Sequence, residues 1–270
     1  MDDFGDFTGK CAVVTGGGGL LGAGMATAFA RKGMNVVVSD LNADTAAATA
    51  AAVEALGAKA LAVTTDVADP DSVERLAEQS YAAFGAVHVL CNNAGLAVLK
   101  PFVELTRTDW NRVLSVQFDG VLNGILTFMP RMIAQGGRSH IVNTSSMSGV
   151  GRADLRQLNA PYVTAKFAVV GLSETMAPSL AEHGIGVSVL CPGMTVADPA
   201  NFTTFKMPSA QWYEHNLLDA DQVAQEVLHG IEENRLHIFP HRAGRGEVQT
   251  RHQQLLDDFD KAERTSPPLG

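Results

Sequence analysis

Short apolar runs rich in β-branched residues alternate along the chain with longer amphipathic or alanine-rich stretches. The runs are typical of strands, and they lie at Ala12–Thr15, Val36–Ser39, Ala60–Val63, Val87–Cys91, His140–Thr144 and Gly186–Leu190. The stretches between them predict helices at Leu21–Lys32, Ala43–Leu56, Pro70–Phe84, Thr108–Ala134 and Pro161–His183. Strands that are apolar throughout need helices on both faces of the sheet. The expected fold is therefore α/β, a doubly wound parallel sheet.

Two helix ends carry clear local signals. Thr108 is expected to cap the long middle helix, with Asp109 in its first turn, and Pro161 suits the first position of the next helix. Pro178 lies inside that next helix, where a proline removes a hydrogen bond and clashes with the preceding turn. We therefore expect a kink or break at Pro178.

The end of the chain follows a different pattern. A helix is predicted over Asp221–Asn234, a short strand over Leu236–Phe239, and a polar helix through Ala262. We expect one domain over residues 1–240 and a C-terminal extension over 241–270, frayed from Arg264 onward.

Composition narrows the class of protein. The chain has 270 residues, 46% hydrophobic and 18% charged, as expected for a globular protein. A net charge of -9 without a basic cluster argues against nucleic-acid binding. No apolar run reaches the length of a membrane span, and Asp2, Asp3 and Asp6 replace the basic start of a signal peptide. We expect a cytoplasmic protein.

The three cysteines, Cys11, Cys91 and Cys191, are too widely spaced for a zinc pattern. We expect them to be small apolar residues of the core, and no metal site is predicted.

A glycine-rich segment follows the first predicted strand and precedes a helix. It reads Thr15-Gly16-Gly17-Gly18-Gly19-Leu20-Leu21-Gly22-Ala23-Gly24. Such a turn lets backbone approach a pyrophosphate, and the helix that follows offers unpaired N–H groups and a favourable dipole. This order predicts a dinucleotide site held by Gly16, Gly18, Gly19, Leu21 and Gly22.

Asp40 ends the second predicted strand. A carboxylate there can accept hydrogen bonds from both hydroxyls of the adenosine ribose and repels a 2′-phosphate, which favours NAD over NADP. The alternative is a loop or helix-capping aspartate, and the nearby Asp44 could cap the next helix equally well.

Tyr162 and Lys166 are four residues apart near the start of a predicted helix, so both lie on one face. A lysine ammonium beside a tyrosine favours the phenolate and brings a poor base closer to working pH. Tyr162 can then accept the hydroxyl proton of an alcohol as hydride leaves, or donate a proton to a ketone oxygen in reverse. The alternative is an amphipathic surface pair.

Further motifs surround this pair in a fixed order. Asn92-Asn93-Ala94-Gly95 follows the fourth predicted strand, Asn143-Thr144-Ser145-Ser146 ends the fifth, and Pro192-Gly193 follows the sixth. With the glycine loop and the Tyr162–Lys166 pair, this order resembles the short-chain dehydrogenase/reductase family, from Lys10 to Ile238. The resemblance implies a Rossmann fold and hydride transfer with a nicotinamide cofactor.

The resemblance also implies roles for matching residues. Lys166 would hold the nicotinamide ribose and Ser146 would orient the substrate oxygen, with Ser145 as the structural alternative. The remaining expected cofactor contacts are Asp66 and Val67 at the adenine, Asn93 beside the cofactor, and the Thr195 backbone at the nicotinamide carboxamide.

The sequence departs from the family's pattern in several places. Leu20 replaces a loop glycine, and Ala197 stands where a threonine is common. The polar segment Gly151–Asn159 is longer than usual; it either reads a polar substrate group or forms a solvated loop. Gln117 occupies the place of a catalytic asparagine, and we expect it to serve in the same proton relay, less well.

By the same resemblance, residues 194–217 form the substrate lid. Its aromatic and large apolar residues are Phe202, Phe205, Met207, Trp212 and Tyr213. They favour a substrate with an aromatic or hydrophobic body, although they could instead pack the lid against its own domain. The segment Asp119–Met132 and the chain's ending resemble alcohol dehydrogenases of lignin-derived aromatics. Pairing through two long helices, usual in the family, would give a homodimer or homotetramer.

We therefore expect an NAD-dependent oxidoreductase that interconverts a secondary alcohol and a ketone, with Ser146, Tyr162, Lys166 and Gln117 as its catalytic residues. An alternative is an NAD-binding regulatory or scaffold protein with lost or weakened catalysis, because fold alone does not prove activity. Epimerisation or dehydration through transient oxidation is a third reading, which the length of the chain disfavours.

Overall fold

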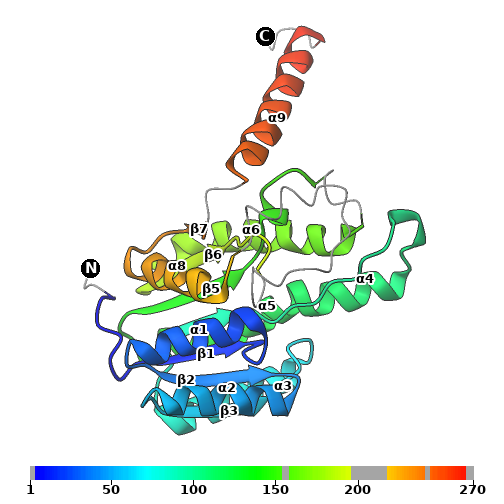
Figure 1. Ribbon diagram of the computed structural model, residues 1–270. Coiled ribbons are helices and arrows are strands. Elements are labelled where there is room, and N and C mark those ends of the chain that lie inside the picture. Colours follow the sequence, from blue (N-terminus) through cyan, green and yellow to red (C-terminus); the bar gives the residue numbers. More distant parts are fainter. Residues whose placement is uncertain (1–3, 154–157, 196–217, 241–243, 266–270) are drawn as a thin grey trace.

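A seven-stranded parallel sheet forms the centre of the molecule, with strand order β3-β2-β1-β4-β5-β6-β7 (Figure 1). The computed structural model describes residues 4–153, 158–195, 218–240 and 244–265. The strands are β1 Cys11–Thr15, β2 Asn35–Asp40, β3 Ala60–Thr64, β4 Val89–Asn92, β5 Ser139–Thr144, β6 Ile185–Leu190 and β7 His237–Ile238. The six predicted core strands and the short strand near the end are thus confirmed, with small shifts of their bounds.

Helices cover both faces of this sheet. They are α1 Leu20–Arg31, α2 Ala43–Ala55, α3 Pro70–Phe84, α4 Arg107–Leu114, α5 Gly120–Gln135, α6 Ala160–Ala181, α8 Ala220–Glu232 and α9 Arg245–Thr265. Helices α1, α2 and α8 bury their apolar residues in one core, and α3, α5 and α6 in the other. Successive side chains of a strand point to opposite faces of the sheet, so Val13 and Val14 of β1 pack in different cores. The doubly wound α/β prediction is confirmed.

The predicted cap of the middle helix is wrong by two residues. Thr106, not Thr108, caps α4; its side chain accepts from the Asp109 N–H, and the Asp109 carboxylate accepts from the Thr106 N–H. This reciprocal capping box satisfies two backbone donors at once. At α2, Asp44 lies inside the first turn, and the cap is Asn42, whose side chain accepts from the Asp44 and Thr45 N–H groups.

The helix does not break at Pro178, since α6 continues to Ala181, and of the two predicted outcomes only a kink stays a prediction. Pro178 lies in the last turn of the helix, three residues before its end, so little of the helix depends on the chain beyond the proline. Leu180, two residues after Pro178, is buried in the core, and this burial holds the final turn in place.

The middle helical stretch Arg107–Gln135 is long and apolar enough to cross a membrane by length and composition, contrary to the sequence expectation. Its residues Phe128 and Met132 are fully buried in the core formed with α3 and α6. The apolar face of this stretch therefore belongs to the core of the domain.

Candidate active site

A cavity of about 420 Å³ lies at the carboxyl ends of the central strands, where the strand order reverses between β1 and β4. The predicted site residues that line it are Gly16, Gly19, Leu21, Gly22, Asp40, Asn93, Gln117, Ser146, Tyr162, Lys166 and Thr195. The other lining residues are Leu20, Gly95, Leu96, Thr144, Ser145, Pro192 and Gly193. The fold thus brings together motifs from opposite ends of the domain, from Gly16 to Thr195.

Three of the predicted cofactor contacts are not among the described residues that line the cavity. The Gly18 N–H is turned to the Asp40 carboxylate, 2.9 Å away. Asp66 is exposed, and the buried Val67 side chain packs against Gly120. The expected adenine contacts of Asp66 and Val67 therefore stay predictions.

The glycine loop fits a pyrophosphate. Gly16 has φ +63°, and a Cβ atom there would lie 2.7 Å from the Cα of Ala94, while a Cβ on Gly22 would clash with the Gly16 carbonyl oxygen. Gly19 precedes α1, and no side chain of the described residues caps this helix. The first turn of α1 lines the cavity, so its backbone N–H groups can receive an anion.

Asp40 lies at the end of β2 with a fixed orientation. Its Oδ2 accepts from the Gly18 N–H at 2.9 Å and its Oδ1 from the Asn42 N–H at 3.0 Å. An ionised carboxylate has about four acceptor positions. Asp40 therefore retains acceptor capacity for ribose hydroxyls while it holds the loop in place.

The two serines after β5 have different surroundings. The Ser145 hydroxyl is buried and donates to the Lys166 carbonyl oxygen at 2.9 Å. The Ser146 hydroxyl lines the cavity and accepts from the Ser148 N–H at 3.1 Å. Because Ser146 is an acceptor in that bond, its hydroxyl hydrogen is available for a ligand.

Lys166 is almost fully buried at the base of the cavity. Its Nζ donates to the Thr144 carbonyl oxygen at 2.7 Å and lies 5.3 Å from the centre of the Tyr162 ring. Burial disfavours the ammonium and lowers the pKa of Lys166 to about 7, with the nearby Cys191 acting in the opposite direction. The charge that Lys166 offers to Tyr162 therefore varies around neutral pH.

Gln117 lies in a π-helical turn, Ser115–Asp119, between α4 and α5. The Gly120 N–H bonds to the Ser115 carbonyl oxygen five residues back, and such turns are frequent at functional sites. The Gln117 Nε2 donates to the Leu96 carbonyl oxygen at 2.6 Å. Its Oε1 is buried without a hydrogen-bond partner among the described residues, so it can accept from a ligand or water in the cavity.

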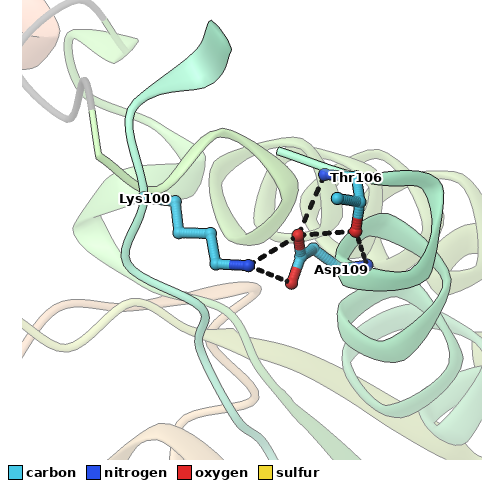
Figure 2. A network of polar contacts seen from close by, with 3 residues as sticks. All are labelled: Lys100, Thr106 and Asp109. Carbon is cyan, nitrogen blue, oxygen red and sulfur yellow. Dashed lines mark hydrogen bonds and ion pairs between the residues drawn. The ribbon is translucent and has the colours of Figure 1, made fainter. Parts of the chain in front are cut away.

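The loop after β4 is anchored beside the cavity by an ion pair (Figure 2). Lys100 Nζ lies 2.9 Å from each carboxylate oxygen of Asp109, which also accepts from Thr106. The Lys100 hydrogen bond is the largest cause that lowers the pKa of Asp109 to about 2. The Lys100 N–H donates to the Leu158 carbonyl oxygen, so the same loop holds the polar insertion.

Several sequence predictions lie outside the described residues. They are Asp154, Arg156 and Gln157 of the insertion, Ala197, and the aromatic residues of the expected lid. The two ends of the lid segment do meet, because Thr195 pairs with Leu218 and the Leu218 N–H donates to the Met194 carbonyl oxygen at 3.0 Å.

Metal ligands were not expected, and no group of three His, Cys, Asp or Glu residues in the described part of the chain could hold a metal ion. Cys11, Cys91 and Cys191 are buried free thiols, as predicted.

Comparisons with known proteins find relatives over almost the whole chain. The family model "short chain dehydrogenase" matches residues 10–205. A C alpha-dehydrogenase from Sphingobium sp. (strain NBRC 103272 / SYK-6) is 32% identical, over 98% of this chain and 90% of that protein. The crystal structure of the apo form of LigD from Sphingobium sp. strain SYK-6 matches with a TM-score of 0.82 and 31% identity, over 98% of this chain and 100% of that one.

A short-chain dehydrogenase/reductase from Burkholderia phymatum, solved in complex with NAD, also has a TM-score of 0.82, with 32% identity over 98% of this chain and 99% of that one. The family model spans the motifs from the glycine loop to Pro192-Gly193, and the structure gathers those motifs around one cavity. The chain therefore belongs to the short-chain dehydrogenase/reductase family of oxidoreductases.

Proposed function

We propose that this protein is an NAD-dependent enzyme that interconverts a secondary alcohol and a ketone. The observation that carries the proposal is the meeting of Ser146, Tyr162 and Lys166 in the cavity that also contains the glycine loop and Asp40. A bound nicotinamide would supply the hydride acceptor or donor. The loop and the first turn of α1 would hold its pyrophosphate.

The protein's own residues account for proton transfer and orientation. Ser146 donates a hydrogen bond to the substrate oxygen. Tyr162 accepts the hydroxyl proton while the hydrogen on the alcohol carbon leaves, with its bonding electron pair, as hydride. A charged Lys166 favours the Tyr162 phenolate. Gln117, whose buried Oε1 has no hydrogen-bond partner among the described residues, is proposed to hold the water that relays the proton onward.

The preference for NAD rests on Asp40. Its carboxylate lines the cavity at the end of β2, where a 2′-phosphate would meet a negative charge. The Burkholderia relative was solved with NAD, which supports the same class of cofactor.

The substrate is proposed to have an aromatic or hydrophobic body, as the aromatic residues of the segment 194–217 favour. We also propose that the protein forms a homodimer or homotetramer paired through the long helices. Its proposed location is the cytoplasm. Binding to nucleic acid or membrane is not part of it.

The test is NADH absorbance with a panel of aryl secondary alcohols and their ketones, with NAD and with NADP. Tyr162→Phe removes only the phenolic hydroxyl, and Tyr81→Phe is the matched control because Tyr81 bonds to Gln135 and does not line the cavity. We expect activity with NAD that Tyr162→Phe loses by roughly 100-fold or more and Tyr81→Phe retains.

The alternative of a regulatory or scaffold protein predicts another result. NAD would bind, measured by calorimetry, while no alcohol or ketone of the panel reacts in the parent protein. Equal activity of the parent and Tyr162→Phe would contradict the proposed role of Tyr162.

A further inference from the structure

Helix α9 is attached to the domain only through its first turns, as far as the described residues show. Gly244, just before the helix, lies against the side chain of Met147. The Arg251 guanidinium lies 4.8 Å from the centre of the Phe167 ring. Beyond this point the helix extends away from the sheet (Figure 1), and every residue from His252 to Ala262 is exposed.

The exposed part of α9 carries an apolar stripe. Leu255, Leu256 and Phe259 are 46%, 56% and 68% exposed. Leu255 and Phe259 are four residues apart, so they lie on one face of the helix, with Leu256 beside them. A single helix of this length is marginal in water unless an apolar face is packed. The stripe therefore has the character of a contact surface.

The net charges of the two halves of α9 run against the helix dipole. In the first two turns Arg245 and Arg251 outnumber Glu247, whereas toward the other end Asp257, Asp258 and Asp260 outnumber Lys261. The helix dipole favours the reverse order, acidic first and basic last. Exposed pairs within the helix, such as Lys261 with Asp258, offset little of this. The same distribution is complementary to a second α9 that runs in the opposite direction.

We propose that α9 pairs antiparallel with α9 of a second copy of this chain. With the two-fold axis near Leu255, the leucines of both copies meet at the centre, and Arg251 of each copy comes close to the aspartates of the other. Such a contact is self-complementary, because each interaction occurs twice by symmetry. The pairing buries the apolar stripe and opposes the basic start of one helix to the acidic end of the other.

Cysteine cross-linking of the full chain tests the pairing and its direction. Leu255→Cys places a thiol at the proposed axis, and the native cysteines are buried, so background is low. Gln249→Cys is the control, since residue 249 is exposed but lies ~9 Å from residue 255 along the helix. We expect an intermolecular disulfide at 255 and none at 249. Cross-linking at 249, as in a parallel pair, or none at 255 overturns the proposal.

Sedimentation provides a second measurement. The double variant Leu255→Asp with Phe259→Asp should break a tetramer into dimers that stay paired through the long helices, or break a dimer held by α9 alone into monomers. Leu56→Asp, an equally exposed leucine at the end of α2, is the matched control and should leave the mass unchanged. A double variant with the parent's mass, or a parent that is monomeric, would show that α9 has another contact or none.

Discussion

The side-chain amide of Gln117 fills the space beside Gly95 that a Cβ atom at residue 95 would need. Such an atom would lie 2.9 Å from Nε2 and 3.0 Å from Oε1 of Gln117. The amide cannot move away freely, because Gln117 is only 2% exposed and donates to the Leu96 carbonyl oxygen. A glutamine at this place therefore depends on a glycine at residue 95.

Gly95→Ala should lower the free energy of unfolding by about 1–3 kcal/mol, because it overpacks this contact. Combining it with Gln117→Asn, which is one methylene shorter, should recover most of the loss. Denaturant unfolding of the parent, both single variants and the double variant measures the coupling. Strictly additive losses would show that the two residues are independent.

Gln117→Asn by itself tests the proton relay. If Gln117 is a poorer substitute for asparagine, this variant should raise the rate or shift the pH profile, while KM for NAD stays similar. The measurement is kcat against pH for the parent and the variant. An unchanged rate and pH profile would count against any relay role for Gln117.

Lys166→Met should separate stability from activity. The pKa of Lys166 is about 7 in the folded protein against 10.5 as its ordinary value. Between these values the unfolded chain binds a proton that the folded protein lacks, so stability rises with pH over this range. Lys166→Met should lose that rise and also lose most oxidoreductase activity. Unfolding at pH 7 and pH 9 measures it; an equal rise in both proteins would contradict the lowered pKa.

His140 should make the fold sensitive to acid. It is fully buried, its Nε2 bonds to the Ser188 hydroxyl at 2.8 Å, and its Nδ1 has no partner among the described residues. Burial first, and then the charge of Arg138, lowers the pKa of His140 to about 3. The folded protein thus resists a proton that the unfolded chain accepts below pH 6.5.

The free energy of unfolding should therefore fall as pH drops from 6.5 toward 3, by up to ~1.4 kcal/mol per pH unit from this residue. His140→Gln keeps a donor for Ser188 and should flatten that slope. His252→Gln, at an exposed histidine of α9, is the control. The same slope in all three proteins would assign the acid sensitivity to other groups.

Thr106→Ala should destabilise the protein by ~1 kcal/mol, because it removes the side-chain cap of α4. Its carboxylate partner Asp109 would keep the ion pair with Lys100 (Figure 2). Thr108→Ala, two residues later on the exposed side of the first turn, should change stability by less than about 0.5 kcal/mol. Thermal unfolding of both variants measures the difference, and the reverse order would favour Thr108 as the cap.

Local patterns determined much of this protein in advance. β-Branched runs and amphipathic stretches predicted the sheet and the helices that cover it, because strand and helix periodicities are properties of short segments. The glycine loop, Asp40, Ser146 and the Tyr162–Lys166 pair could be selected because each belongs to a recognisable motif at a strand end or a helix start. The structure places all of these motifs at one cavity.

Other features depended on contacts between distant segments, which no short pattern contains. The Leu96 carbonyl oxygen and Gly95 take part in the site through contacts with Gln117, which comes from another element. The π-helical turn that carries Gln117 and the burial that carries α6 past Pro178 are likewise products of packing. The near-neutral pKa of Lys166 comes from its burial beneath the cavity. Residue type and spacing could nominate the catalytic groups, but only the tertiary structure determined their surroundings, because burial and orientation arise when separate elements meet.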